Sequence, residues 1–197
     1  MVRSMSRWAG GLTLLLVMAL PCLAAPAAPP QRPSDRSTRF PLRRESGGTR
    51  SVCVSRLLAH LVPLDGQFDP GGGAVIGLIE GESPRPPALV VQLAGRPPLV
   101  LPPRPAGVRL VLLPTPPPLG LWESFPACNA TAEPEAPPAR SELLRRTVPL
   151  DLPLQRALQD LRSRCGGSVQ RDGLLPVFGY EHLRGQLPAE LPVSCEP

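Results

Sequence analysis

Apolar residues gather in short runs along the middle of the chain, and prolines and glycines separate the runs. They cover residues 74–79, 88–93, 99–101, 108–113 and 119–122. The strings between them, GESPRPP, AGRPP, PPRPAG and PTPPP, are rich in turn-forming residues. Short apolar runs spaced by about ten residues, with turn residues between them, are typical of antiparallel β structure. The pattern therefore predicts a mainly β fold, either a small antiparallel sandwich or an open barrel of short strands.

Several of these runs are continuous rather than alternating, which predicts strands that are covered on both faces. Just before them, residues 57–62 (LLAHLV) place leucines and valine at helix-like spacing. Pro63 would end such a helix after little more than one turn.

The clearest helix is predicted within residues 151–167, with Asp151 as N-cap candidate and a Gly-Gly pair as its end. One face of this helix carries Leu154, Leu158, Leu161 and Cys165. Cys165 is therefore expected to point into an apolar interface, where a disulfide to the tail would fasten the helix. Beyond it the sequence predicts a short strand or turn, one helical turn around 181–185, and an extended tail to Cys195. Together these elements form a C-terminal unit that follows the β region.

The N-terminus has the three parts of a secretory signal peptide: Arg3 and Arg7, an apolar run over 12–20, and a stretch of small residues. Nine apolar residues are too few to span a membrane. Cleavage is expected after Ala24 or after Ala27. Two alternatives remain: an uncleaved signal that tethers the chain, and a lipid anchor on Cys22, which the preceding proline disfavours.

Composition divides the rest of the chain into segments. Residues 1–24 are the predicted signal peptide and 25–47 a Pro- and Arg-rich leader. Residues 48–130 form the β-rich domain, 131–147 are expected to be a linker in which SELLRR could be one helical turn, and 148–197 form a C-terminal helix and tail unit. The predicted fold is thus mainly β with a helix-containing C-terminal unit and Pro-rich linkers.

Losing Cys22 with the signal leaves four cysteines: Cys53, Cys128, Cys165 and Cys195. An even number in an oxidising compartment predicts two disulfides. Three pairings are possible. The preferred one, Cys53–Cys128 with Cys165–Cys195, keeps each bridge within one compositional segment. No Cys-x-x-Cys pair occurs and no histidine lies near a cysteine, so no metal site is expected.

The basic residues are all arginine, at 21 positions, and proline occupies 30 of the 197 positions. The arginines are scattered among acids rather than arranged in a stripe. Nucleic-acid binding would also need aromatic stacking platforms, of which the chain has few. No nucleic-acid partner is therefore expected, and proline confines helices to a few windows.

The strings GGTRSVC, LLAHLVPLDG and GVRLVLLPTPPPLGLWESFPACN give the chain a resemblance to a family of secreted cyanobacterial domains of unknown function. It covers about residues 47–129. The resemblance implies a bacterial β-sandwich-like domain in which Cys53 and Cys128 match the two family cysteines, and it implies no catalytic residues. The aromatic cluster usual in that family after the Leu-Val-Pro segment is missing here.

No pattern for catalysis stands out. GGSVQ at 166–170 lacks the final glycine of a nucleophile elbow. The acid pairs Glu80/Glu82 and Glu133/Glu135 are read as solvated loops, and DPGGG at 69–73 as a turn. His60 is read as a residue at the edge of the core and His182 as a surface residue.

The sequence therefore predicts no catalytic, cofactor-binding or metal-binding residues. The expected function is a secreted or periplasmic module, disulfide-stabilised and not an enzyme, that binds an unknown protein or envelope component or has a structural role there. After signal cleavage no stable membrane span is expected. One alternative is a secreted hydrolase that uses His60 or His182. The other is a largely disordered Pro-rich envelope linker.

Overall fold

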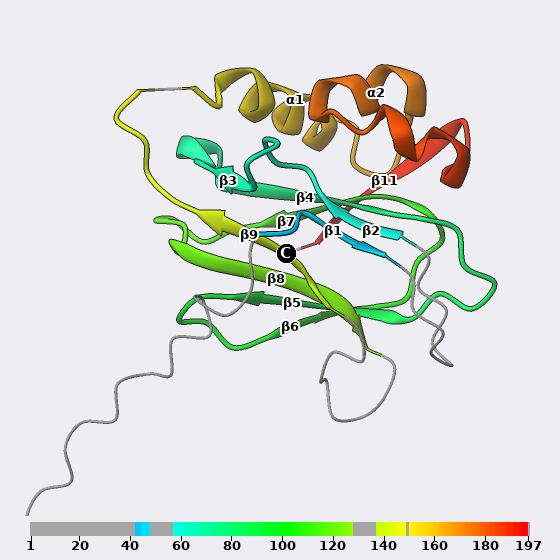
Figure 1. The fold of residues 1–197 in the computed structure, drawn as a ribbon, viewed down its shortest axis with the longest axis horizontal. Helices are drawn as coiled ribbons and strands as arrows, with labels where there is room; N and C mark the ends of the chain where they lie inside the picture. Colours follow the sequence, from blue (N-terminus) through cyan, green and yellow to red (C-terminus); the bar gives the residue numbers. More distant parts are fainter. Residues whose placement is uncertain (1–41, 48–56, 128–136, 149, 197) are drawn as a thin grey trace, which may run out of the picture. The chain divides into compact units, whose positions relative to one another are not determined.

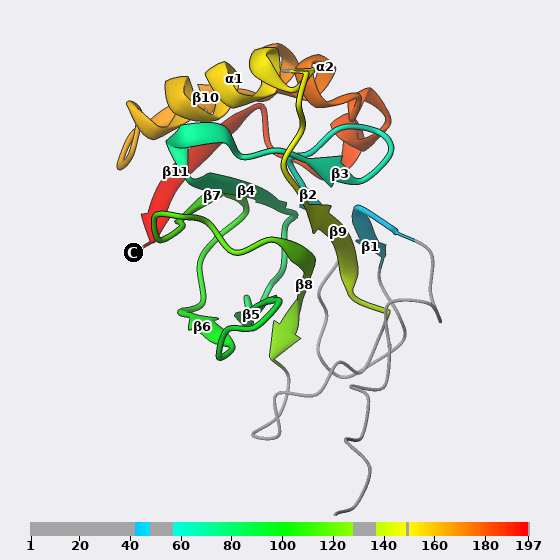
Figure 2. The same cartoon turned by 90° about the vertical axis from the view of Figure 1, so that its left-hand side faces the viewer.

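A computed structural model of the protein describes residues 42–47, 57–127, 137–148 and 150–196. All of them belong to one compact unit, Arg36–Pro197. Within these residues the chain forms two mixed β-sheets and a layer of helices, as Figures 1 and 2 show. The mainly β architecture with a C-terminal helical part confirms the predicted fold class.

The first sheet has six strands among the described residues, in the order β1-β2-β4-β7-β11-β10. Their bounds are β1 Glu45–Gly47, β2 Leu57–His60, β4 Val75–Glu80, β7 Gly107–Leu112, β11 Glu190–Glu196 and β10 Ser168–Gln170. Neighbours are antiparallel except β7 and β11, which are parallel with Val193 opposite Val108. The tail of the chain therefore lies inside this sheet.

The second sheet has five described strands, in the order β3-β9-β8-β5-β6. Their bounds are β3 Gln67–Phe68, β9 Ala139–Leu143, β8 Gly120–Ala127, β5 Ala88–Leu93 and β6 Leu99–Leu101. The apolar runs of the sequence became β4 to β8. The short edge strand β6 has prolines on both sides, which limits pairing with another chain.

Helices α1 (Leu152–Arg162) and α2 (Arg171–Phe178) cover one face of the first sheet, with the 3-10 turns η2 (Gly71–Gly73) and η3 (Glu181–Gln186) (Figure 2). The contact is close at Gly77 of β4, where an added Cβ would lie 2.8 Å from the Leu158 side chain of α1. Strands alternate their side chains, so Leu78 and Glu80 point to the other face, toward the second sheet. The first sheet is thus covered on both faces, which explains its continuous apolar runs.

Three local predictions were wrong. Residues 57–60 form strand β2 rather than a helix. The prediction failed because a strand that is buried on both faces has a continuous apolar run, and such a run also fits helical spacing. SELLRR contributes to strand β9, and the residues after 170 form helix α2 rather than a strand or turn. The predicted helical turn near 181–185 is present as η3.

Two segments that were placed outside the β-rich domain supply parts of its sheets. Residues 45–47 of the predicted leader form β1, and the predicted linker contains β9. Arg44 is also fixed there, since its guanidinium donates to the carbonyl oxygens of Phe178 and Gly179 and lies 4.1 Å from the centre of the Tyr180 ring. Non-local contacts of this kind leave no pattern in the local sequence.

Candidate functional site

Four charged side chains lie along the face of the first sheet that is turned toward the second sheet, with Arg109 between Glu80 and Glu196 in the strand register. Glu80 is the last residue of β4, Arg109 lies on β7 and Glu196 is the last residue of β11. Arg109 is opposite Leu78 in the strand register, so it shares the face of Glu80 that is turned toward the second sheet. Arg104, from the loop before β7, completes the cluster.

The cluster contains one buried ion pair and one in which only the arginine is exposed. Nε of Arg109 lies 2.5 Å from Oε2 of Glu80, and the Arg109 side chain is only 1% exposed. Nε of Arg104 lies 3.4 Å from Oε1 of Glu196, and the Arg104 side chain is 47% exposed. A buried pair of this kind carries a large desolvation cost, whereas the outer pair is weakened by solvent.

Burial raises the pKa of the Glu80 carboxyl. The nearby Arg109 guanidinium opposes that rise and Glu196 adds to it. The prediction that Glu80 lies in a solvated loop is therefore wrong, because Glu80 ends β4 and its side chain is only 15% exposed, whereas Glu82 is exposed. A carboxyl with a perturbed pKa beside a pocket is typical of functional sites.

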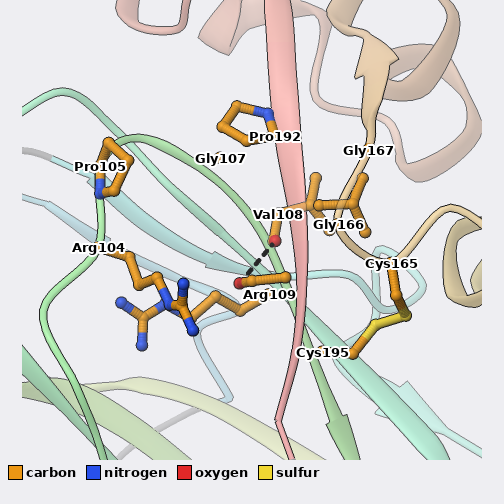
Figure 3. A pocket seen from close by; sticks show the side chains of 12 residues that line it. Arg104, Pro105, Gly107, Val108, Arg109, Cys165, Gly166, Gly167, Pro192 and Cys195 are labelled. Atoms are coloured by element: carbon orange, nitrogen blue, oxygen red, sulfur yellow. Dashed lines mark hydrogen bonds between the residues drawn. A yellow bond between two sulfur atoms is a disulfide. The ribbon is translucent and has the colours of Figure 1, made fainter.

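A pocket of about 490 Å³ lies beside this cluster and is open to solvent (Figure 3). Arg104 and Arg109 line it, together with Pro105 and Pro192, and the Cys165–Cys195 disulfide forms part of its wall. Gly107 is required here, since a Cβ on it would lie 2.5 Å from the carbonyl oxygen of Pro192 and would push β11 away from β7. The pocket thus combines one exposed cation, Arg104, and one buried cation, Arg109, with apolar walls.

The disulfide joins Cys165 to Cys195 with their Cα atoms 5.6 Å apart, the pair that the sequence analysis preferred. Cys165 does not point into an apolar interface as expected, because α1 ends at Arg162 and Cys165 is exposed in the following turn. Cys53 and Cys128 lie outside the described residues. So do Cys22 and the predicted cleavage sites after Ala24 and Ala27.

His60 has a serine partner that no sequence pattern indicated. Its Nδ1 lies 2.8 Å from the hydroxyl oxygen of Ser141, and its ring stacks on Trp122 with centroids 3.6 Å apart. Both His60 and Ser141 are 0% exposed, between the two sheets. Burial lowers the pKa of His60 well below its ordinary value. The pair is therefore placed to hold the sheets together, and a substrate would have no path to it in this conformation.

The other candidates have different surroundings. His182 is exposed, with Nε2 3.1 Å from Oε2 of Glu45. The DPGGG segment is a turn that contains η2, as predicted. Its Asp69 carboxylate accepts hydrogen bonds from the backbone N–H groups of Gly71 and Arg146. Burial alone would raise the pKa of Asp69, but these donors and the Arg145 guanidinium lower it overall. Glu133 and Glu135 lie outside the described residues.

Among the described residues there is no group of three or more His, Cys, Asp or Glu side chains that could hold a metal ion. In the same part of the chain, no helix has the length and apolar content needed to cross a membrane. Comparisons with protein families, with characterised proteins and with solved structures find no match for the chain. The resemblance to the cyanobacterial domains stays a prediction.

Proposed function

We propose that the protein is a secreted or periplasmic, disulfide-stabilised domain that binds a protein or envelope component and is not an enzyme. The observation that carries this proposal is the pocket beside the disulfide. Its exposed Arg104 and its proline-rich walls are groups that bind and orient a partner. The Cys165–Cys195 bridge supports the oxidising compartment, because such bridges persist mainly outside the cytosol.

The competing proposal is a hydrolase that uses His60. The hydrogen bond to Ser141 is the specific observation in its favour. The burial of both side chains argues against it, because a nucleophile has to reach its substrate. Hydrolysis of ester, peptide or glycoside substrates by the purified mature protein, lost in a Ser141→Ala variant, would overturn the binding proposal.

Export and bridging can be tested together on the protein produced with its own N-terminus in a bacterial host. We expect intact and peptide mass spectrometry without reductant to show cleavage after Ala24 or Ala27, two disulfides and no acyl group. An acyl mass on an N-terminal Cys22 would establish a lipid anchor instead. A mature chain found in the cytosol with reduced cysteines would contradict the proposed compartment.

A further inference from the structure

The buried guanidinium of Arg109 has donors that the described chain does not use. Its two terminal nitrogens make no hydrogen bond within the part of the chain that the structure describes. Glu80 supplies one charged contact at Nε and leaves both terminal nitrogens without an acceptor. Arginine has five N–H donors, and buried donors without acceptors are costly. The arrangement therefore indicates an acceptor that is supplied from outside these residues.

Arg104 is the second cation of the pocket and the exposed member of its ion pair. Its contact with Glu196 is long, at 3.4 Å, and nearly half of the side chain is exposed. The Glu196 side chain is only 9% exposed, so its carboxylate needs Arg104 as a partner. The terminal N–H groups of Arg104 can take a second carboxylate while Nε stays with Glu196.

The walls of the pocket limit what this acceptor can be. Pro105, Pro192 and Val193 supply apolar surface, and the Ser194 hydroxyl donates only a long hydrogen bond of 3.4 Å to the Val108 oxygen. Figure 3 shows both arginines on one side of β11 and the disulfide on the other. A ligand on the arginine side of β11 would thus meet the cations together with the apolar surface of Pro105 and Pro192.

The charge of the cluster favours a monoanion. Two arginines face two glutamates, so the charges balance and a phosphate dianion would meet more repulsion from the glutamates than a monoanion would. A carboxylate matches the planar fork of a guanidinium and takes two hydrogen bonds from it. We propose that this pocket binds a molecule with a single carboxylate next to an apolar group, held by Arg104 and Arg109. This inference rests on the proposed binding function.

Binding involves a small rearrangement. The Arg109 nitrogens have almost no solvent contact in this structure, so a ligand reaches them only when a neighbouring side chain moves. Arg104 is suited to that movement, because its exposed terminal nitrogens can turn toward the ligand while Nε stays with Glu196. Arg109 then gains the acceptor that it lacks.

The test is an NMR titration of the ¹⁵N-labelled mature chain with N-acetylleucine. N-acetylleucinamide, which has the same shape without the charge, is the matched control ligand, and inorganic phosphate is the second control. We expect N-acetylleucine to shift the backbone signals of Gly107, Val193 and Ser194 and the side-chain Nε–H signal of Arg109. The amide and phosphate should leave them in place.

Arg104→Gln should weaken N-acetylleucine binding by about tenfold, the loss expected for one charge-assisted contact. Arg96→Gln is the matched variant, because Arg96 is an exposed arginine in the β5–β6 turn and is not among the pocket residues. It should bind like the natural protein. The Arg109 Nε–H signal of the natural protein reports on the second arginine without a substitution at position 109.

Equal shifts with the amide, equal shifts with phosphate, or no shifts at all would each overturn the carboxylate site. None of these results would affect export, bridging or a partner bound elsewhere, so the proposed function would stand. Hydrolysis by the purified protein would instead overturn the proposed function, whatever the titration shows.

Discussion

The imidazole of His60 stacks on the indole of Trp122, with ring centroids 3.6 Å apart and planes within 6° of each other. His60 belongs to the first sheet and Trp122 to the second. The indole N–H of Trp122 donates a hydrogen bond of 2.8 Å to the Ser124 hydroxyl, and Nδ1 of His60 forms one of 2.8 Å with the Ser141 hydroxyl. All four side chains are buried. The interface between the sheets is therefore fixed by a directional polar cluster in addition to aliphatic packing.

The first prediction concerns the coupling of His60 and Ser141. His60→Phe keeps an aromatic ring on Trp122 but leaves the Ser141 hydroxyl without its partner, and Ser141→Ala strands the imidazole Nδ1. Each should lower the free energy of unfolding by about 1–3 kcal/mol. The double variant should lose less than the sum of the two, because it leaves neither group unpaired. Denaturant unfolding of the four proteins measures the coupling, and strict additivity would contradict it.

The second prediction follows from the low pKa of His60. The unfolded chain binds a proton at this residue below about pH 6.5, whereas the buried imidazole stays neutral in the fold. The unfolded state thus binds more protons, and stability falls as pH decreases below that value, by at most about 1.4 kcal/mol per pH unit. Unfolding free energies at pH 7.5 and 5.5 should differ more for the natural protein than for His60→Phe. Equal differences would show that His60 titrates normally in the fold.

The strands that could be predicted from the sequence are those whose pattern is local. Turn residues bracket the apolar runs of β4 to β8, and each run became a strand. The segment of β2 could not be assigned this way, since burial on both faces removes the alternation that marks a strand. The tail strand β11 depends on parallel pairing with β7, more than 80 residues earlier in the chain. That pairing leaves no local trace.

The same distinction applies to the candidate site. Arg109 interrupts an apolar run, and a charged residue within a strand covered on both faces needs a partner, so this signal could have pointed to it. Its partner Glu80 ends another run. The pairing of His60 with Ser141 had no such signal, because the sequence around Ser141 has no pattern that predicts a buried serine. The burial of Ser141 depends on how β9 packs on β2.

The third prediction tests the close contact of α1 with the first sheet. Gly77→Ala would place a Cβ 2.8 Å from the side chains of Leu158 and Leu61, in the packed layer between helix and sheet. Such overpacking should lower the free energy of unfolding by about 1–3 kcal/mol. Gly173→Ala in α2 is the matched control, because an added Cβ meets nothing within 4 Å there. Helix propensity should make that variant more stable by about 0.5–1 kcal/mol.

Thermal unfolding of the two glycine variants measures both effects in one experiment. The melting temperature should fall for Gly77→Ala and rise slightly for Gly173→Ala. A Gly77→Ala protein as stable as the natural one would show that the helix can move away from the sheet without cost, which would contradict the close packing described above.

The last prediction concerns the bridge from Cys165 to Cys195, which closes a loop of 30 residues in sequence. In the loop-entropy model such a bridge stabilises by about 3–4 kcal/mol, because it restricts the unfolded chain. The double variant Cys165→Ala/Cys195→Ala should lose that amount in denaturant unfolding under oxidising conditions. Both positions are changed together so that no free thiol is left to exchange with Cys53 or Cys128. A loss below about 1 kcal/mol would contradict this role, since the pairing of β7 with β11 would then hold the tail without the bridge.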